Sequence, residues 1–289
     1  MNRPPTYLER LDERRRVWWQ KPRDYRDPRT YSDFLHQIAE RHVLRSRHDP
    51  EERWHCCRHW QRSLVNKWNG REFAIRHGVP VPELYWCGRR LSKLDFEALP
   101  SRCVIKPAFG HSRRGVFVLC EGVELLSGTR KGREDVLRTL GRTGDRLLNG
   151  PVLVEEFMGD GSGRARMPLD VNFHMFGREV GAVQVIKRSP VKGETRCTFY
   201  SAAWEPFAEP LNRYLPELDP VSAPTQLPEL LKAARRLGQA CETYIRVDFR
   251  VTGDRFAFGE FATTPPMGWT PFGDAHFGRL WQETFPAAI

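Results

Sequence analysis

The chain has 289 residues, of which 40% are hydrophobic and 28% charged, a composition typical of a soluble globular protein with a substantial core. It has no apolar run long enough for a membrane span, no signal-peptide core and an odd number of cysteines, so we expect a cytoplasmic protein. A net charge of +10 predicts an anionic partner, although charge alone does not rank a nucleotide, an anionic glycan, a nucleic acid or a membrane surface.

Residues 1–65 are rich in arginine, histidine and tryptophan and are expected to form a helical, basic N-terminal region. Apolar spacing predicts helices over residues 31–43 and 51–68. The segment 14–23 mixes basic and stacking side chains, as do binders of single-stranded nucleic acid or of membrane edges. A helix whose tryptophans pack inward and whose arginines are solvated explains the same pattern, and we expect no specific nucleic-acid partner.

Residues 66–102 are expected to form an N-terminal lobe. A helix over residues 66–77 should end at Gly78, because glycine is the preferred residue just beyond a helix C-terminus. The proline-punctuated stretch that follows predicts an extended segment.

A basic hairpin is expected over residues 103–118, with Lys106 at the end of its first strand. The turn carries Gly110, Ser112 and Gly115, and the two glycines permit positive φ and close backbone approach. Successive N–H groups in such a turn can bind an anion, with Lys106 as a point charge on a phosphate. A solvated basic turn without a ligand is the alternative.

Residues 103–158 are expected to form one subdomain, which contains this hairpin, a helix within residues 121–147 and a strand over residues 152–158. Residues 159–289 should form a second subdomain. It begins with a flexible loop over residues 159–166 and continues with strands over 170–175 and 180–186. An amphipathic helix over 227–244 and a hairpin of strands 245–251 and 255–261 follow.

Asp248 and Glu260 lie at interior positions of the last two strands. A buried carboxylate is costly unless a cation or hydrogen bonds compensate its charge, which favours a functional site. Two carboxylates on the solvent face of an edge hairpin are the alternative.

The order of these features resembles the ATP-grasp fold. VIKPAFGHSRRGV resembles its phosphate-binding segment, VLVEEF its hinge strand, and RVDF with FGEF its metal-binding hairpin. The stretches DPRTYSDFL, NKWNGREF, FYSAAW and FGEFATTPPMGW are similar to the TupA-like ATP-grasp family. The resemblance implies an α+β fold in which two α+β lobes clamp a nucleotide, with a helical N-terminal extension.

The resemblance also implies roles for particular residues. Lys106 would contact the α and β phosphates, Arg71 would be a second basic phosphate ligand, and the loop from Gly110 through Ser112 to Gly115 would cover the β and γ phosphates. The backbone of Glu155, Glu156 and Phe157 would contact adenine, and Asp160 would contact the ribose.

Asp248 and Glu260 would hold Mg²⁺, which prefers carboxylate and phosphate oxygens. Arg188 and Arg196 would be catalytic, neutralising the transferred phosphoryl group or holding the acid substrate. Two positions depart from the family pattern. Ala262 stands where a metal-binding asparagine is common, and Asn66 replaces the aspartate of an Asp-Lys pair.

The implied activity is that of an ATP- and Mg²⁺-dependent carboxylate–amine ligase that forms an amide through an acylphosphate. Its substrates would be a small-molecule or glycan acid and an amine, and the family association suggests an anionic cell-surface polysaccharide or an acidic peptide. Two alternatives stay open, a kinase that phosphorylates an alcohol and a basic polyanion-binding protein with a decayed nucleotide site.

Overall fold

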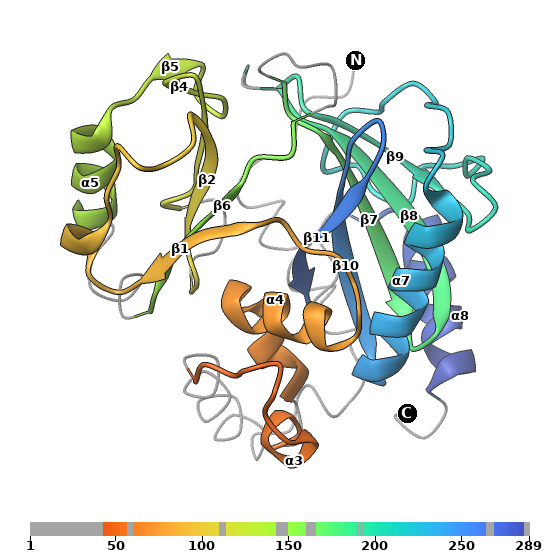
Figure 1. Ribbon diagram of the computed structural model, residues 1–289. Coiled ribbons are helices and arrows are strands. Elements are labelled where there is room, and N and C mark those ends of the chain that lie inside the picture. Colours follow the sequence, from red (N-terminus) through yellow and green to blue (C-terminus); the bar gives the residue numbers. More distant parts are fainter. Residues whose placement is uncertain are drawn as a thin grey trace.

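Two antiparallel β-sheets with helices packed on them form the architecture of the protein (Figure 1). The computed structural model describes residues 43–56, 60–109, 114–142, 150–159, 166–189, 191, 193–263 and 269–285. The basic segment 14–23 and nearly all of the helix expected over residues 31–43 lie outside this part of the chain. No helix in the described ranges is both long and apolar enough to cross a membrane.

The first sheet has six strands in the order β1-β6-β2-β3-β4-β5. Their bounds are β1 Leu84–Gly88, β2 Arg102–Pro107, β3 Phe117–Cys120, β4 Val123–Glu124, β5 Thr129–Arg130 and β6 Val152–Glu156. Helix α5, Arg133–Arg142, packs on one face, where Val136 and Leu140 join Ile105 and Val154 in a buried apolar cluster. Side chains alternate between the faces of a strand, so Val104 and Lys106 lie on the opposite face.

The expected basic hairpin is confirmed as β2 and β3, which pair antiparallel with Val104 opposite Val118. Gly115 has a φ of +70°. A Cβ atom at this position would approach Pro107 Cγ to 3.0 Å, so both the backbone angle and the space favour glycine.

The second sheet has five strands in the order β11-β10-β7-β8-β9. Their bounds are β7 Leu169–Phe176, β8 Glu179–Lys187, β9 Arg196–Tyr200, β10 Tyr244–Val251 and β11 Phe256–Ala262. Helix α7, Leu227–Cys241, confirms the predicted amphipathic helix and buries Leu230 and Leu237 against Phe173 and Phe249. Helix α8, Pro271–Thr284, packs on the other face, where Phe277 stacks on Phe176.

The two faces of this second sheet differ in chemistry. Along β7, Val171, Phe173 and Met175 belong to the apolar core, whereas Asp170, Asn172 and His174 alternate with them and lie on the opposite face. The strands on either side continue this polar face. The sheet therefore combines a large hydrophobic core with a polar surface on which a site can be built.

The helix expected over residues 51–68 is wrong as a single element. The structure has α3, Glu51–Trp54, and then a 3₁₀ helix η2, Trp60–Val65, before α4, Lys67–Arg76. Asn66 explains the break between η2 and α4, because it adopts an extended conformation and its side chain accepts hydrogen bonds from the backbone N–H groups of Trp68 and Asn69. An N-cap at this position requires the preceding helix to have ended.

The predicted helix over residues 66–77 is confirmed as α4, with Gly78 in the left-handed region just beyond it. Helix α4 packs against η2 and β11, whereas β1, which follows it in the chain, belongs to the first sheet. A short 3₁₀ helix η3, Leu91–Lys93, follows β1. This segment therefore connects the two halves of the molecule.

The Asn66 cap has a measurable energetic effect. Asn66→Ala should lower the free energy of unfolding by about 0.5–2 kcal/mol, because two N–H groups of α4 lose their acceptor. Asn66→Asp, which keeps the acceptor, should stay close to the wild type. Urea denaturation of both variants measures the difference, and equal losses in the two would contradict the capping role.

Candidate active site

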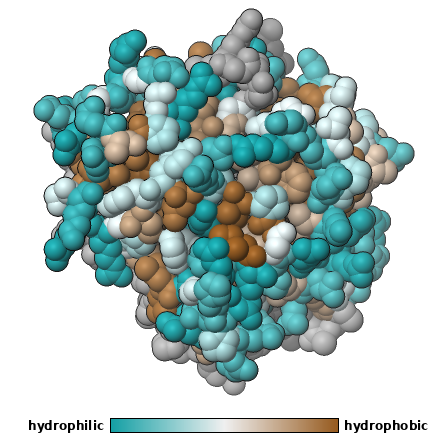
Figure 2. All heavy atoms as spheres, viewed as in Figure 1, coloured by the Kyte–Doolittle hydropathy of each residue, from teal (hydrophilic) through white to brown (hydrophobic). Residues whose placement is uncertain are grey.

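A cleft of about 300 Å³ lies between the two sheets, and residues of both sheets line it. Its apolar wall comes mainly from the first sheet and the segment after β6, with Val104, Val118, Phe157 and Met167 among its residues. Figure 2 shows apolar residues gathered near the middle of this view of the molecule, within a mostly hydrophilic surface. Such a wall suits a flat, partly apolar ligand group.

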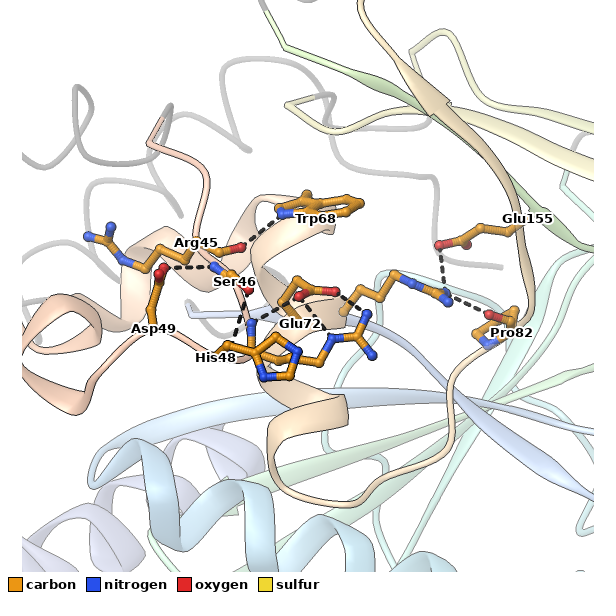
Figure 3. A network of polar contacts seen from close by, with 10 residues as sticks. Arg45, Ser46, His48, Asp49, Trp68, Glu72, Pro82 and Glu155 are labelled. Atoms are coloured by element: carbon orange, nitrogen blue, oxygen red, sulfur yellow. Dashed lines mark hydrogen bonds and ion pairs between the residues drawn. The ribbon is translucent and has the colours of Figure 1, made fainter.

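A buried carboxylate on β6 organises the cationic side of the first sheet. Glu155 is 2% exposed, and its Oε2 lies 2.5 Å from Lys106 Nζ. Arg71 NH1 lies 3.3 Å from Glu155 Oε1 and donates to the carbonyl oxygen of Pro82 at 2.6 Å (Figure 3). Glu155 therefore holds both cations that the sequence assigned to phosphate binding, but only Lys106 lines the cleft.

Among the residues that the structure describes, four cationic side chains line the cleft, and they come from four different segments. They are Lys67 at the start of α4, Lys106 on β2, Arg188 just after β8 and Arg250 on β10. Glu155, Glu156 and Glu260 are the acidic side chains of the same lining. This arrangement of charges is suited to an anion accompanied by a divalent cation.

Glu260 on β11 is the acidic residue of the second sheet that lines the cleft. Burial by itself would raise the pKa of Glu260, but the positive charges of Lys67 and Arg250 outweigh burial and lower it below the ordinary value. The Lys106 charge acts in the same direction, although Lys106 belongs to the first sheet. Glu260 is therefore ionised at neutral pH.

Asp248 lies directly opposite Glu260 in the β10–β11 pair. It is 2% exposed, which rules out the alternative of a solvent-facing carboxylate. Arg246, two residues earlier on the same face, binds both Asp248 oxygens, at 2.6 and 2.7 Å. This bidentate pairing compensates only part of the buried charge, because burial still raises the pKa of Asp248 above its ordinary value.

Of the two carboxylates assigned to Mg²⁺, Glu260 lines the cleft, whereas Asp248 is buried and is not among the residues that line it. Within the described ranges no three histidine, cysteine or acidic side chains gather into a metal-binding cluster. Mg²⁺ is commonly held by one or two carboxylates together with phosphate oxygens and water. Each oxygen of Asp248 has a second lone-pair site beyond its bond to Arg246. Ala262 supplies no side-chain oxygen at the third position.

The remaining predicted site residues have different outcomes. Gly110, Ser112 and Asp160 lie outside the described residues. Phe157 and Glu156 line the cleft, and Glu156 also forms an ion pair with Arg255.

The two arginines predicted to be catalytic are separated in the structure. Arg188 lines the cleft, whereas Arg196 is exposed on β9 and donates to the carbonyl oxygen of Glu217. The structure does not bring Arg196 to the cleft.

Two cleft residues were missed by the sequence interpretation. Arg250 alternates with Arg246 and Asp248 along β10, so strand periodicity could have placed it on the same face as the predicted metal ligand. Lys67 follows the helix N-cap, and no local pattern indicates that this end of α4 reaches the cleft.

A buried histidine lies on the polar face beyond the carboxylates. His174 Nδ1 lies 2.9 Å from the Tyr244 hydroxyl, and its ring packs against Trp269 and Phe277. Burial, together with the positive charge of Arg246, lowers the pKa of His174 to about 3. The native protein therefore keeps this ring neutral at all but strongly acidic pH.

The depressed pKa of His174 predicts a pH dependence of stability. Between pH 6.5 and about 3 the unfolded chain binds a proton at this residue and the native state does not, so stability falls as pH decreases. The contribution should reach about 1.4 kcal/mol per pH unit. Urea denaturation across this range should show a shallower pH dependence for His174→Gln than for the wild type. Identical slopes would contradict the assignment.

Comparisons with known proteins agree with the geometry. The family model described as TupA-like ATPgrasp matches residues 82–285, more than half of the chain. No curated protein matches by sequence. Among solved structures, D-alanine–D-alanine ligase from Bacillus anthracis has 15% sequence identity and a TM-score of 0.50, covering 78% of this chain and 66% of that chain. The same enzyme complexed with ATP has 15% identity and a TM-score of 0.49, with the same coverage.

A further similar structure is the ATP-grasp ligase PsnB complexed with a minimal precursor variant, Mg and ADP, with 14% identity and a TM-score of 0.43, covering 78% of this chain and 60% of that one. This chain therefore spans about two-thirds or less of the length of these relatives. The Bacillus anthracis ligase shares its fold, and the family match extends over both sheets and over all the described cleft residues except Lys67. The chain belongs to the TupA-like ATP-grasp family.

Proposed function

We propose that the protein is an ATP-dependent carboxylate–amine ligase that uses Mg²⁺. The observation that carries this proposal is the cleft itself, in which Lys106 of one sheet and Glu260 of the other line the same cavity. Lys106 would bind the α and β phosphates of ATP, and the apolar wall around Phe157 would receive adenine. Asp248 and Glu260 would hold Mg²⁺, which neutralises phosphate charge when bound.

The reaction would proceed in two balanced steps. A carboxylate oxygen of the acid attacks the γ-phosphorus while the bond to the leaving ADP oxygen breaks, which gives an acylphosphate and ADP. An amine then attacks the carbonyl carbon, the carbon–oxygen bond to phosphate breaks, and an amide, phosphate and a proton result. The protein would position ATP and the two substrates, and Lys106, Arg188 and Arg250 would stabilise the negative charge of the phosphoryl group.

The acid would be a small molecule or glycan, and the positive net charge of the protein favours an anionic substrate. Modification of a cell-surface polysaccharide or an acidic peptide is the proposed context. The distinction between an amine and an alcohol acceptor depends on the product, because a kinase would share the nucleotide site.

The test is a thermal-shift series with MgATP, followed by ADP release across a panel of amino acids and uronic acids with and without added amines. A ligand at 100 times its Kd should stabilise the protein by about 2.7 kcal/mol. ADP release that requires both an acid and an amine supports the ligase. A phosphorylated alcohol without amide would indicate a kinase. Steeply salt-dependent polyanion binding with no MgATP effect would overturn the nucleotide site.

A further inference from the structure

Asp170 is a fully buried carboxylate that pairs with two arginines. It lies on β7 with 0% exposure, directly opposite Arg250 on β10, whose NH1 lies 2.5 Å from Asp170 Oδ1. On its other side Asp170 lies opposite Ile186 of β8, and the chain just beyond that strand brings Arg188 Nε onto Asp170 Oδ2. One carboxylate thus ties together two segments that are 62 positions apart in the chain, from 188 to 250.

Both arginines, but not Asp170, line the cleft. Their side chains remain 19% and 26% exposed. A guanidinium carries five N–H donors, and Asp170 engages one nitrogen of each, so both arginines retain donors for a group in the cleft. Arginine guanidinium groups do not lose their proton in proteins. The pair therefore stays cationic.

A substrate in the cleft does not reach Asp170, because the carboxylate has no exposed surface. The residue could serve stability alone, but buried ion pairs often give no more stability than apolar residues of similar size. Its geometry has a more specific consequence, since it fixes both guanidinium groups in one orientation before any ligand arrives. Preorganised donors stabilise developing charge more effectively than donors that must rearrange.

We propose that Asp170 is a positioning residue that holds Arg188 and Arg250 as a clamp for the phosphoryl group while it is transferred. The inference rests on the proposed function and deepens it. During transfer the bond from phosphorus to the ADP oxygen breaks, the bond to the substrate carboxylate forms, and negative charge spreads over the three remaining phosphoryl oxygens. Two fixed guanidinium groups are suited to these oxygens because their N–H donors match phosphate geometry.

The experiment uses a probe that needs no substrate, MgADP with and without aluminium fluoride, which mimics the phosphoryl group in transfer. Calorimetry and thermal shift would compare the wild-type protein with Asp170→Asn. The matched control is Glu72→Gln, because Glu72 is also a buried carboxylate, 3% exposed and paired with Arg47, but lies outside the cleft lining. A purely structural role predicts the same outcome for both variants.

In the wild type, aluminium fluoride should add stabilisation beyond that of MgADP alone. Asp170→Asn should bind MgADP about as the wild type does but lose about 100-fold in affinity for the fluoride complex. Glu72→Gln should retain that affinity. If Asp170→Asn does not fold, Arg250→Lys keeps Asp170 paired and should show the same selective loss, because lysine lacks the planar fork.

Retention of the full fluoride increment in the folded Asp170 variant, or in Arg250→Lys if the former does not fold, overturns the clamp and leaves the nucleotide site standing. If aluminium fluoride adds no stabilisation to the wild type beyond that of MgADP, the clamp is likewise overturned and the nucleotide site stands. If the wild type does not bind MgADP, the proposed function fails and the clamp with it. An equal loss in Glu72→Gln would show that both carboxylates act only on stability.

Discussion

Replacing Glu260 with glutamine is expected to lower ATP turnover by at least about 100-fold, because the cleft-lining carboxylate that we propose as a Mg²⁺ ligand loses its charge. Glu260 lines the cleft, and the pKa of its carboxyl is held below its ordinary value by Lys67 and Arg250 against the effect of burial. The ionised form is therefore the one present at neutral pH. Glutamine has nearly the same shape but no charge.

The measurement is ADP release at saturating ATP as a function of Mg²⁺ concentration, with exposed Glu205→Gln as the control. A metal-binding role predicts that part of the lost rate returns at high Mg²⁺. The variant should remain folded, since Glu260 is only half-buried. Unchanged turnover in a folded Glu260→Gln protein would rule out this residue as a metal ligand.

Arg246→Met is expected to destabilise the protein by about 3–5 kcal/mol, because it leaves the Asp248 carboxylate buried without its partner. The two side chains share two hydrogen bonds, and Asp248 is 2% exposed. Adding Asp248→Asn to this variant should restore part of the loss, since the uncompensated charge is then removed. The losses from the two single substitutions should therefore not add.

Urea denaturation of both single variants and the double variant measures the coupling. Additive losses, within about 0.5 kcal/mol, would contradict the ion pair. These variants also affect how the proposed metal site can be tested. Asp248→Asn lowers stability by leaving Arg246 unpaired, so a loss of activity in that variant has two causes. Glu260→Gln is the cleaner test of the metal site.

The local sequence predicted most helices and strands correctly where a single residue type or the spacing of apolar residues determined the structure. Gly78 and Gly115 adopt left-handed backbone conformations, and the apolar stripe of α7 identifies a helix that packs against the core. The helix over residues 51–68 failed because its apolar spacing continued past the end of α3 at Trp54 and across Asn66, whose capping side chain begins a new helix. Hydrophobic spacing does not show where an N-cap interrupts it.

The candidate site was predictable in its types of residue but not in their partners. The sequence alone determined that Lys106 lies at the end of a strand and that Asp248 and Glu260 lie at interior positions of strands, because the pattern of apolar residues along a chain is a local property. Only the tertiary structure decided that Arg71 contacts Glu155 and does not line the cleft, that Arg196 lies away from it, and that Arg250 lines it. These outcomes depend on which strands pair and how two sheets face each other, and such contacts join residues far apart in the chain. The ion-pair partner of a charged side chain depends on this packing, and no local sequence pattern predicts it.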